Sequence, residues 1–294
     1  MRATHSEPIT AFDSPGRDSE TDAAQRRPVA ADRGPGIRNL PDSVFGVGGV
    51  LAFAALLELL PRMGVLPRAY FPPLSEMLAA LIGLLGRSSF WTALFDTVRG
   101  WGIGLAIAVA AGIIIGFLIS TSAQLIRITA STIEFLRPIP SVALIPLAVL
   151  LFGTDIRSTL LLVVYASFWP ILIQVLHGVQ DINPVARDTT ASYGFSRWAV
   201  FRYLIWPTAL PYLMTGVRLS ASVALVLTIS AELIIGSPGL GTEIARSQSS
   251  NATADVYATV IVTGVLGIVV NILVRSIERR VLSWHASMRK DVSA

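Results

Sequence analysis

Long apolar runs alternate with short polar segments along most of this chain. From Val44 onward, stretches of about twenty mainly apolar residues recur, and this is the length with which a helix crosses a bilayer. They predict six membrane-spanning helices: Val44–Met63, Val98–Ser120, Ile133–Phe152, Ser158–Gly178, Tyr212–Leu233 and Val256–Arg275. The pattern therefore predicts an all-α membrane protein.

A shorter apolar segment, Pro72–Gly86, lies between the first two runs. Ser75 caps its apolar stretch, which is too short to cross a bilayer, so we expect an extracytoplasmic helix that lies at the interface or packs on protein. Phe90, Trp91 and Phe95 follow it and are predicted to anchor the chain at the membrane surface.

The first forty residues mix charged residues with Pro, Gly, Ser and Thr and show no apolar periodicity. This composition is typical of disorder, and the segment lacks the apolar core of a signal peptide. We predict a disordered cytoplasmic tail over residues 1–42, the first span and interfacial helix over 43–92, a core domain over 93–278 and a cytoplasmic tail over 279–294.

A polar island of about thirty residues, Asp181–Pro211, separates two of the predicted spans. Asn183 is suited to cap a helix and Pro184 to occupy its first position, while Gly194 tolerates a left-handed stop. These signals predict a short helix that ends before Gly194.

A second short helix is predicted within the same island. Ser196 can cap a helix over Arg197–Trp206, and Pro207 is expected to end it and to keep it from fusing with the next span. We call Asp181–Pro211 the platform and predict that it contacts a partner; the alternative is a polar loop that only connects two spans.

Composition supports the membrane assignment. In 294 residues, 53% are hydrophobic and 14% charged, and the mean hydropathy is +0.64, which is too apolar for an ordinary soluble domain. The net charge of +4 does not point to nucleic acid, because the arginines lie between apolar spans, where the positive-inside rule accounts for them.

The basic residues also predict an orientation. With the N-terminus in the cytoplasm, thirteen basic residues flank the inner ends of the spans and five flank the outer ends. The sequence therefore predicts a multi-pass inner-membrane protein, with both termini and the platform in the cytoplasm.

Several kinds of catalytic site are excluded by residue content. The chain has no cysteine, and its single lysine, Lys290, is followed by Asp291, so it cannot form the Gly-x-x-x-x-Gly-Lys-Ser/Thr loop that cradles nucleotide phosphates. It also has no HExxH metal motif and no Gly-x-Ser-x-Gly elbow. We expect no catalytic, cofactor-binding or metal-binding residue here, and if transport is ATP-driven, ATP and magnesium belong to another polypeptide.

The platform carries a family resemblance. Asp188-Thr-Thr-x-x-x-Gly194, nine further residues and Leu204-Ile-Trp-Pro207 resemble the EAA loop of ABC-importer permeases, Glu-Ala-Ala-x-x-x-Gly-x9-Ile-x-Leu-Pro. The glycine and proline spacing matches, whereas Asp188, Thr189, Thr190, Leu204 and Trp206 depart from the family's residues. The resemblance implies that Asp188, Thr189, Thr190, Gly194, Leu204 and Pro207 couple the chain to an ATPase.

The resemblance covers roughly Phe95–Glu278, including Leu136-Arg-Pro-Ile-Pro140, Ile145-Pro146-Leu147 and Gly239-Leu240-Gly241. These segments are most similar to the subfamily that imports nitrate, taurine and aliphatic sulfonates. It implies a permease subunit that works as a homodimer with two ATPase copies and receives its solute from an extracytoplasmic binding protein.

Prolines and glycines mark two of the spans. Pro138, Pro140 and Pro146 interrupt the third span, which predicts either a broken helix that lines a pathway or a kinked packing helix. Glycines 100, 104, 112 and 116 form two small-xxx-small pairs, which predict close helix packing within the chain or across a dimer.

Intramembrane charges supply the remaining candidates. Arg218 and Glu232 are fourteen residues apart on one face of the fifth span, about 21 Å, which excludes a direct pair. With Ser222, Thr228 and Ser230 they form a candidate pathway stripe; the alternative is that both charges reach the span ends.

Two further charges, Glu134 and Arg137, are spaced to pair locally at the inner end of the third span. That inner position argues for a structural role and against primary recognition of an anionic solute.

The sequence thus predicts the permease subunit of an ATP-driven importer of a small anion, working by alternating access. A secondary transporter is the first alternative, and it would be expected to carry inverted repeats. A membrane scaffold or receptor subunit is the second, and it would not need the platform's glycine and proline spacing.

Overall fold

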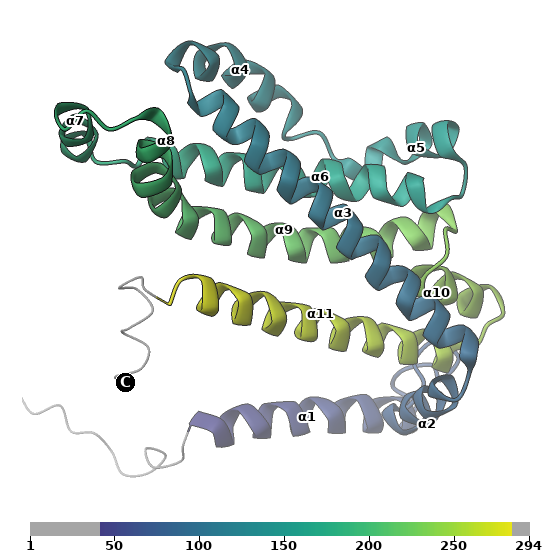
Figure 1. The fold of residues 1–294 in the computed structure, drawn as a ribbon. Coiled ribbons are helices and arrows are strands. Elements are labelled where there is room, and N and C mark those ends of the chain that lie inside the picture. The colour runs from purple at the N-terminus through teal and green to yellow at the C-terminus, as the bar shows by residue number, and fades with distance from the viewer. Residues whose placement is uncertain (1–41, 284–294) are drawn as a thin grey trace, which may run out of the picture. The chain divides into compact units, whose positions relative to one another are not determined.

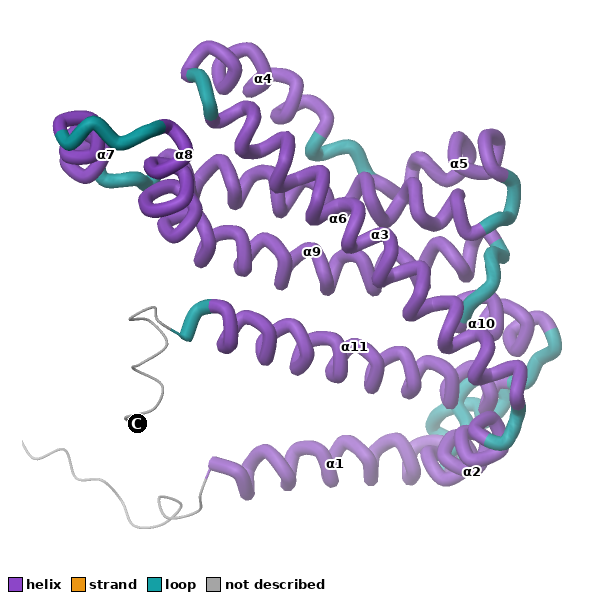
Figure 2. The backbone as a smooth tube through the Cα atoms, in the orientation of Figure 1, coloured by secondary structure: helices purple, strands orange, loops and turns teal. Residues whose placement is uncertain are grey.

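The computed structural model describes residues 42–283, and within that range every regular element is helical (Figures 1 and 2). The chain divides into two units, residues 1–52 and 53–294. The described part of the first unit is the beginning of α1 (Asp42–Arg62), and the second unit holds the other helices. The tail predicted over residues 1–42 lies almost wholly outside the described residues.

Four predicted spans are confirmed as long apolar helices. They correspond to α3 (Ser88–Ser120), α6 (Ile156–Gln180), a continuous helical stretch over Arg197–Ile235 that ends in α9 (Trp206–Ile235), and α11 (Thr253–Val281). The predicted first span, Val44–Met63, coincides with α1 except for Met63, and the 21 residues of α1 extend about 31 Å.

The third predicted span, Ile133–Phe152, is not one straight crossing. Its residues belong to α4 (Ala123–Leu136), a 3₁₀ turn (Ser141–Leu144) and α5 (Ile145–Phe152), and the two halves are bent by 81°. The break contains Pro138 and Pro140, each of which removes a backbone N–H donor, so the predicted interruption is confirmed. Pro146 instead lies in the first turn of α5, where proline is tolerated.

The break is stabilised from outside the helix. The Leu136 carbonyl would normally accept from residue 140, which is a proline without an N–H. The Tyr165 hydroxyl on α6 donates to this carbonyl at 2.7 Å, and the Ile139 N–H donates to it at 3.2 Å. A neighbouring span therefore satisfies a carbonyl that the proline leaves free, as a bend at membrane depth requires.

Glycines bring α3 close to α6. A Cβ added at three of them would approach a branched side chain of α6 to 2.6–2.7 Å: Gly104 meets Val163, Gly112 meets Ile171 and Gly116 meets Val175. The predicted close packing is confirmed, and its partner for these glycines lies within the chain.

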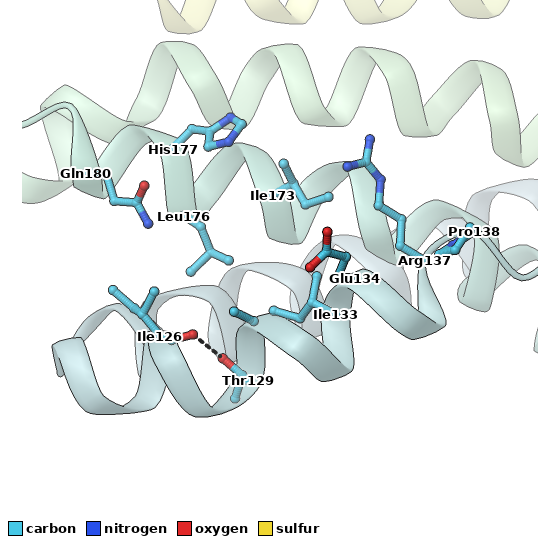
Figure 3. Close-up of a pocket in the computed structure, with 11 residues that line it drawn as sticks. Ile126, Thr129, Ile133, Glu134, Arg137, Pro138, Ile173, Leu176, His177 and Gln180 are labelled. Atoms are coloured by element: carbon cyan, nitrogen blue, oxygen red, sulfur yellow. Dashed lines mark hydrogen bonds between the residues drawn. The ribbon is translucent and has the colours of Figure 1, made fainter.

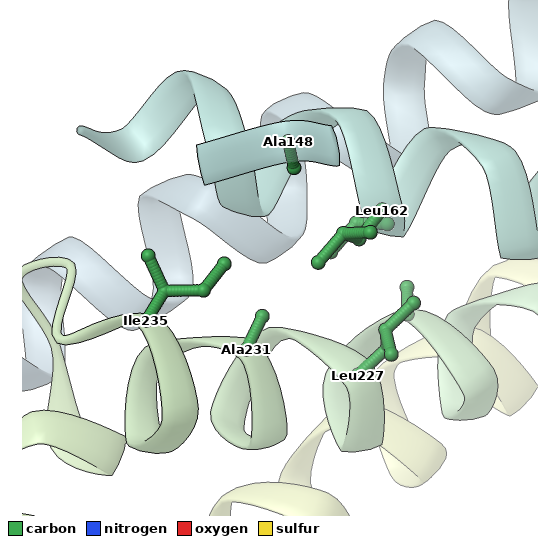
Figure 4. Packing of buried hydrophobic residues seen from close by; sticks show 7 residues of the cluster. Ala148, Leu162, Leu227, Ala231 and Ile235 are labelled. Carbon is green, nitrogen blue, oxygen red and sulfur yellow. The ribbon is translucent and has the colours of Figure 1, made fainter. Parts of the chain in front are cut away.

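α6 packs on its other side against α9, and the largest buried cluster lies there (Figure 4). Ala148 of α5, Leu162 of α6 and three residues of α9, Leu227, Ala231 and Ile235, belong to it. α6 therefore packs between α3 and α9. This packing positions the short helices that lie at the two ends of the bundle.

Short helices occupy the two ends of this bundle (Figure 1). α7 (Pro184–Ser192) and α8 (Arg197–Val200) lie at the end where α3 passes into α4, whereas α2 (Leu74–Leu85) and α10 (Leu240–Ser249) lie at the opposite end. α2 confirms the predicted short helix. Of its predicted aromatic anchors, Trp91 and Phe95 are exposed, but Phe90 is 3% exposed and packs in a core cluster, so that prediction was wrong for Phe90.

Candidate functional site

The first platform helix forms as its capping residues predict. The Asn183 side chain accepts a hydrogen bond from the Val185 N–H at 2.8 Å, and Pro184 occupies the first turn of α7. The helix ends before Gly194, whose φ of +67° lies in the left-handed region that favours glycine. Among residues 42–283, its chain neighbours aside, no atom lies within 4 Å of a Cβ built on Gly194, so in this part of the chain its backbone conformation is what constrains the position.

The three residues that stand at the Glu-Ala-Ala positions of the EAA pattern follow one another along α7. Asp188 and Thr189 are exposed, whereas Thr190 is half-buried. The Thr189 hydroxyl donates to the Val185 carbonyl and the Thr190 hydroxyl to the Arg187 carbonyl, each at 2.7 Å. No ion pair is recorded for Asp188 among residues 42–283, which leaves its carboxylate open to a partner.

The second platform helix begins as predicted but continues further. The Ser196 side chain accepts from the Ala199 N–H at 3.2 Å and caps α8. A π-helical turn, Phe201–Ile205, then leads directly into α9, with the Trp206 N–H donating to the Phe201 carbonyl.

The prediction that Pro207 ends the second helix is therefore wrong. Pro207 is the second residue of α9 and follows the wide π turn directly. At such a position the missing N–H of proline is more easily tolerated than in a regular helix interior. Helical structure runs without a break from Arg197 to Ile235, so the second platform helix and the fifth span are one element.

Two contacts fasten the platform to the bundle. Leu204 is half-buried against the cluster of Val179, Ile182 and Ala209, which joins the end of α6 to the start of α9. The Tyr212 hydroxyl of α9 donates to the Asp181 carboxylate at 2.6 Å. These contacts join the platform to the end of α6 and the start of α9.

Large apolar side chains are exposed on this otherwise polar platform. They are Val185 (71% exposed), Tyr193 (77%), Phe195 (48%), Trp198 (71%) and Tyr203 (72%). Exposed apolar groups among polar residues are typical of a surface that contacts another protein or a membrane.

The candidate pathway stripe on α9 is divided by its packing. Arg218 forms an ion pair with Glu278 of α11, and the Glu278 side chain is 9% exposed. The Ser222 and Thr228 hydroxyls donate to carbonyls one turn earlier in their own helix, and Thr228 is fully buried. Ser222 is exposed and Ser230 is half-buried, so these two remain the more accessible hydroxyls of the stripe.

Glu232, the fifth candidate of the stripe, lies inside the bundle with 2% exposure. Its carboxylate accepts from the Thr97 hydroxyl of α3 at 2.8 Å and from the Gly241 N–H at 3.0 Å, and Thr97 in turn accepts from the Leu240 N–H at 2.8 Å. A Cβ at Gly239 would collide with the carboxylate, which explains the glycine. This network joins α3, α9 and α10.

Two adjacent cavities open where α4 breaks. The first, about 590 Å³, lies between α4 and the C-terminal half of α6 and includes Glu134, Arg137 and His177 in its wall (Figure 3). The second, about 520 Å³, is lined by the break, by α6 and by α9, and it contains the predicted pathway residues Pro138 and Pro140.

Comparison with known proteins places the chain in a family. The family profile of the binding-protein-dependent transport system inner membrane component matches residues 108–283, more than half of the chain. The chain belongs to this family. It is thus an inner-membrane, multi-pass permease of the ABC-importer type, and its predicted family resemblance is confirmed.

Several curated permeases resemble the chain. It is 30% identical over 225 residues to the taurine transport system permease protein of Escherichia coli, covering 75% of this chain and 82% of that one. It is 26% identical to a putative aliphatic sulfonates transport permease of Bacillus subtilis, covering 79% and 84%. It is 27% identical to the nitrate import permease of Leptolyngbya laminosa, covering 66% and 69%.

Solved structures confirm the fold. The MetNI methionine ABC transporter in an inward-facing conformation matches with a TM-score of 0.57 at 17% identity, covering 66% of this chain and 96% of that one. A bacterial alginate ABC transporter in complex with its periplasmic protein matches with a TM-score of 0.58 at 15% identity, covering 82% and 95%.

Three features of the site were not predicted from the sequence: the Glu232–Thr97 network, the Arg218–Glu278 pair and the π turn before Pro207. The Gly239-Leu240-Gly241 segment was the one available signal for the network, because closely spaced glycines often mark a close backbone approach. The other two depend on contacts between residues far apart in sequence or on a helix type without a sequence signature.

Proposed function

We propose that this permease forms the translocation pathway of an ATP-driven importer of a small anionic solute of the sulfonate or nitrate class. The solute class is supported by relatives named for taurine, aliphatic sulfonates and nitrate. Transport proceeds by alternating access, in which ATP-driven closure of separate ATPase subunits moves the platform and reorients the spans.

One observation carries this proposal. The capped helix α7 meets α8 at the left-handed Gly194, and α8 continues through the π turn into α9 as a single element. A force applied to α7 and α8 is therefore delivered to the fifth span, which packs along α6 and also contacts α3. Asp188, Thr189, Thr190, Gly194, Leu204 and Pro207 are the proposed coupling residues.

The proposed assembly contains two copies of this permease, two ATPase subunits and an extracytoplasmic solute-binding protein. The exposed aromatic residues Tyr193, Trp198 and Tyr203 provide the apolar area with which the platform meets the ATPase. In this arrangement the platform and both termini face the cytoplasm, and α2 and α10 face the binding protein.

The test is a matched pair of substitutions at Gly194. Gly194→Val forces a β-branched residue into a left-handed conformation, at a cost of about 1–2 kcal/mol or more, whereas Gly194→Asn tolerates that conformation. We expect the valine variant to insert into the membrane but to lose ATPase retention and ATP-dependent uptake of ethanesulfonate, while the asparagine variant keeps most of both.

Each alternative function gives a different result. A secondary transporter would accumulate solute without a co-purified ATPase and would respond to ion gradients. A scaffold or receptor subunit would show no uptake in either variant. Equal ATPase retention and equal uptake by the two Gly194 variants would refute coupling through the platform.

A further inference from the structure

The second cavity, about 520 Å³, lies near the middle of the long helices α6 and α9 rather than at their ends. On α6 its wall runs from Tyr165 to Gln174, and Trp169 lies about 17 Å from the inner end of that helix and about 20 Å from the outer end. On α9 its wall includes Leu219 and Val223, close to the middle of Trp206–Ile235. Solute sites of transporters are commonly found at this depth.

Arg137 is the charged residue in the wall of this cavity. The sequence alone suggested an inner position for it, but the bend after Leu136 brings it against the middle of α6, where the Tyr165 hydroxyl fixes the Leu136 carbonyl at 2.7 Å. Figure 3 shows the Arg137 side chain extending from the end of α4 toward α6. A guanidinium at this depth is costly unless it faces water or a binding partner.

Arg137 has no ion-pair or hydrogen-bond partner recorded among residues 42–283. Glu134, one turn earlier on α4, is the nearest carboxylate in sequence, but no ion pair joins it to Arg137 within the same described range. Glu134 lines the first cavity and not the second. The second cavity therefore presents positive charge with no carboxylate in its described wall.

Hydrogen-bond donors surround the same space. The Gln174 amide and the Ser141 hydroxyl line the cavity, and neither has a recorded side-chain hydrogen bond in the described part of the chain. The stem of Gln174 passes close to α9 at Gly216, where a Cβ built on the glycine would lie 3.1 and 3.3 Å from the Gln174 Cβ and Cγ. A guanidinium with two uncharged donors matches the needs of a small singly charged oxyanion.

We propose that Arg137, with Gln174 and Ser141, binds the oxyanion group of the transported solute in this mid-membrane cavity. The proposal rests on the proposed function, since it takes the solute to be an anion of the sulfonate or nitrate class. In this proposal, the break at Pro138 and Pro140 brings the end of α4, which lies toward the cytoplasm, to the centre of the pathway.

The test uses the absence of cysteine from the chain. Val223→Cys places one thiol in the cavity wall of the permease in its ATPase complex, reconstituted in nanodiscs. Its labelling is compared for two methanethiosulfonates, one with a sulfonatoethyl group and one with a trimethylammonioethyl group. We expect Arg137→Gln to lower the ratio of anionic to cationic labelling rates by about fivefold or more.

Arg127→Gln provides the matched control, because Arg127 is an exposed arginine on the same helix that lines neither cavity. It should leave the labelling ratio unchanged. Ethanesulfonate should slow labelling in the Val223→Cys parent and in the Arg127→Gln control but not in Arg137→Gln, and Arg137→Lys should retain part of the protection. An unchanged ratio and full protection in Arg137→Gln would overturn the proposal.

Two further results separate this proposal from neighbouring explanations. If Arg137→Gln fails to assemble, Gln174→Leu keeps the side-chain stem and should weaken protection by ethanesulfonate; full protection would count against the site. If the parent shows anion-selective labelling and protection but no ATP-dependent uptake, the importer function fails while the anion site stands. If the parent imports ethanesulfonate and Arg137→Gln does so with the same KM, the site fails and the function stands.

Discussion

The tight contact between α3 and α6 predicts that Gly112→Ala destabilises the permease. The added Cβ would lie 2.7 Å from Cγ2 and 2.9 Å from Cβ of Ile171, and 3.4 Å from the Leu172 backbone nitrogen. Ile171 is fully buried, so its branched side chain has little room to move. Inserting a methyl group into such packing costs about 1–3 kcal/mol.

Alanine also favours a helix over glycine by about 1 kcal/mol, and this gain must be measured separately. Gly102 lies on the same helix, and within the described part of the chain no atom beyond its own helix backbone lies within 4 Å of a Cβ built there, so Gly102→Ala measures the gain alone. The difference between the two variants isolates the packing cost, expected at about 1–3 kcal/mol or a few degrees in melting temperature.

The assay is thermal and denaturant unfolding of the purified permease complex in detergent, followed by helical circular dichroism. Ile171→Ala removes the Cγ2 contact at 2.7 Å and leaves the Cβ at 2.9 Å, so the packing cost of Gly112→Ala should become smaller in that background. Equal unfolding free energies for Gly102→Ala and Gly112→Ala would refute the packing of α3 on α6 described above.

Three further predictions concern the unpredicted contacts and the platform. Thr97→Val removes a donor to the Glu232 carboxylate and an acceptor for the Leu240 N–H, so it should lower the unfolding free energy by about 2–3 kcal/mol. Thr92→Val, at an exposed position of α3, should change the unfolding free energy little. Arg218→Met leaves the buried Glu278 unpaired and should lower the unfolding free energy by about 1–3 kcal/mol. Adding Glu278→Gln should restore most of this loss, and additive losses in the double variant would show that the pair is not coupled. Asn183→Ala removes the α7 cap and should cost about 1 kcal/mol of local stability, read as faster hydrogen exchange over Pro184–Ser192, while unchanged exchange would contradict the capping assignment.

Much of the fold follows from local signals in the sequence. Apolar length identified the spans, and the caps Asn183 and Ser196 together with the left-handed Gly194 located both platform helices, because each of these signals acts within a few residues. The small-residue spacing on α3 likewise indicated close packing, although only the structure shows that α6 is its partner.

The remaining features depend on contacts between distant parts of the chain. Pro207 looks like a helix stop by itself, but the preceding π turn and the packing of Leu204 allow the helix to continue. The place of Arg137 near the start of the third predicted span suggested a position at the inner surface, whereas the 81° bend brings it to a cavity lined by the middle of α6. Glu232 was a candidate for the pathway from its place on the fifth span, but α3 and α10 enclose its side chain.

The most direct test of the central proposal is site-specific cross-linking from the platform to the ATPase. Because the natural chain has no cysteine, Tyr193→Cys introduces one exposed thiol in the permease at the end of α7, and Gln248→Cys introduces a matched exposed thiol on α10 at the opposite end. A maleimide reagent carrying a photoreactive group is attached to the purified permease before it is recombined with its ATPase. Coupling through the platform predicts that Tyr193→Cys forms a permease–ATPase adduct whose yield changes with ATP, and that Gln248→Cys forms none. If the permease retains the ATPase but cross-links to it equally poorly from both positions, the proposal is contradicted.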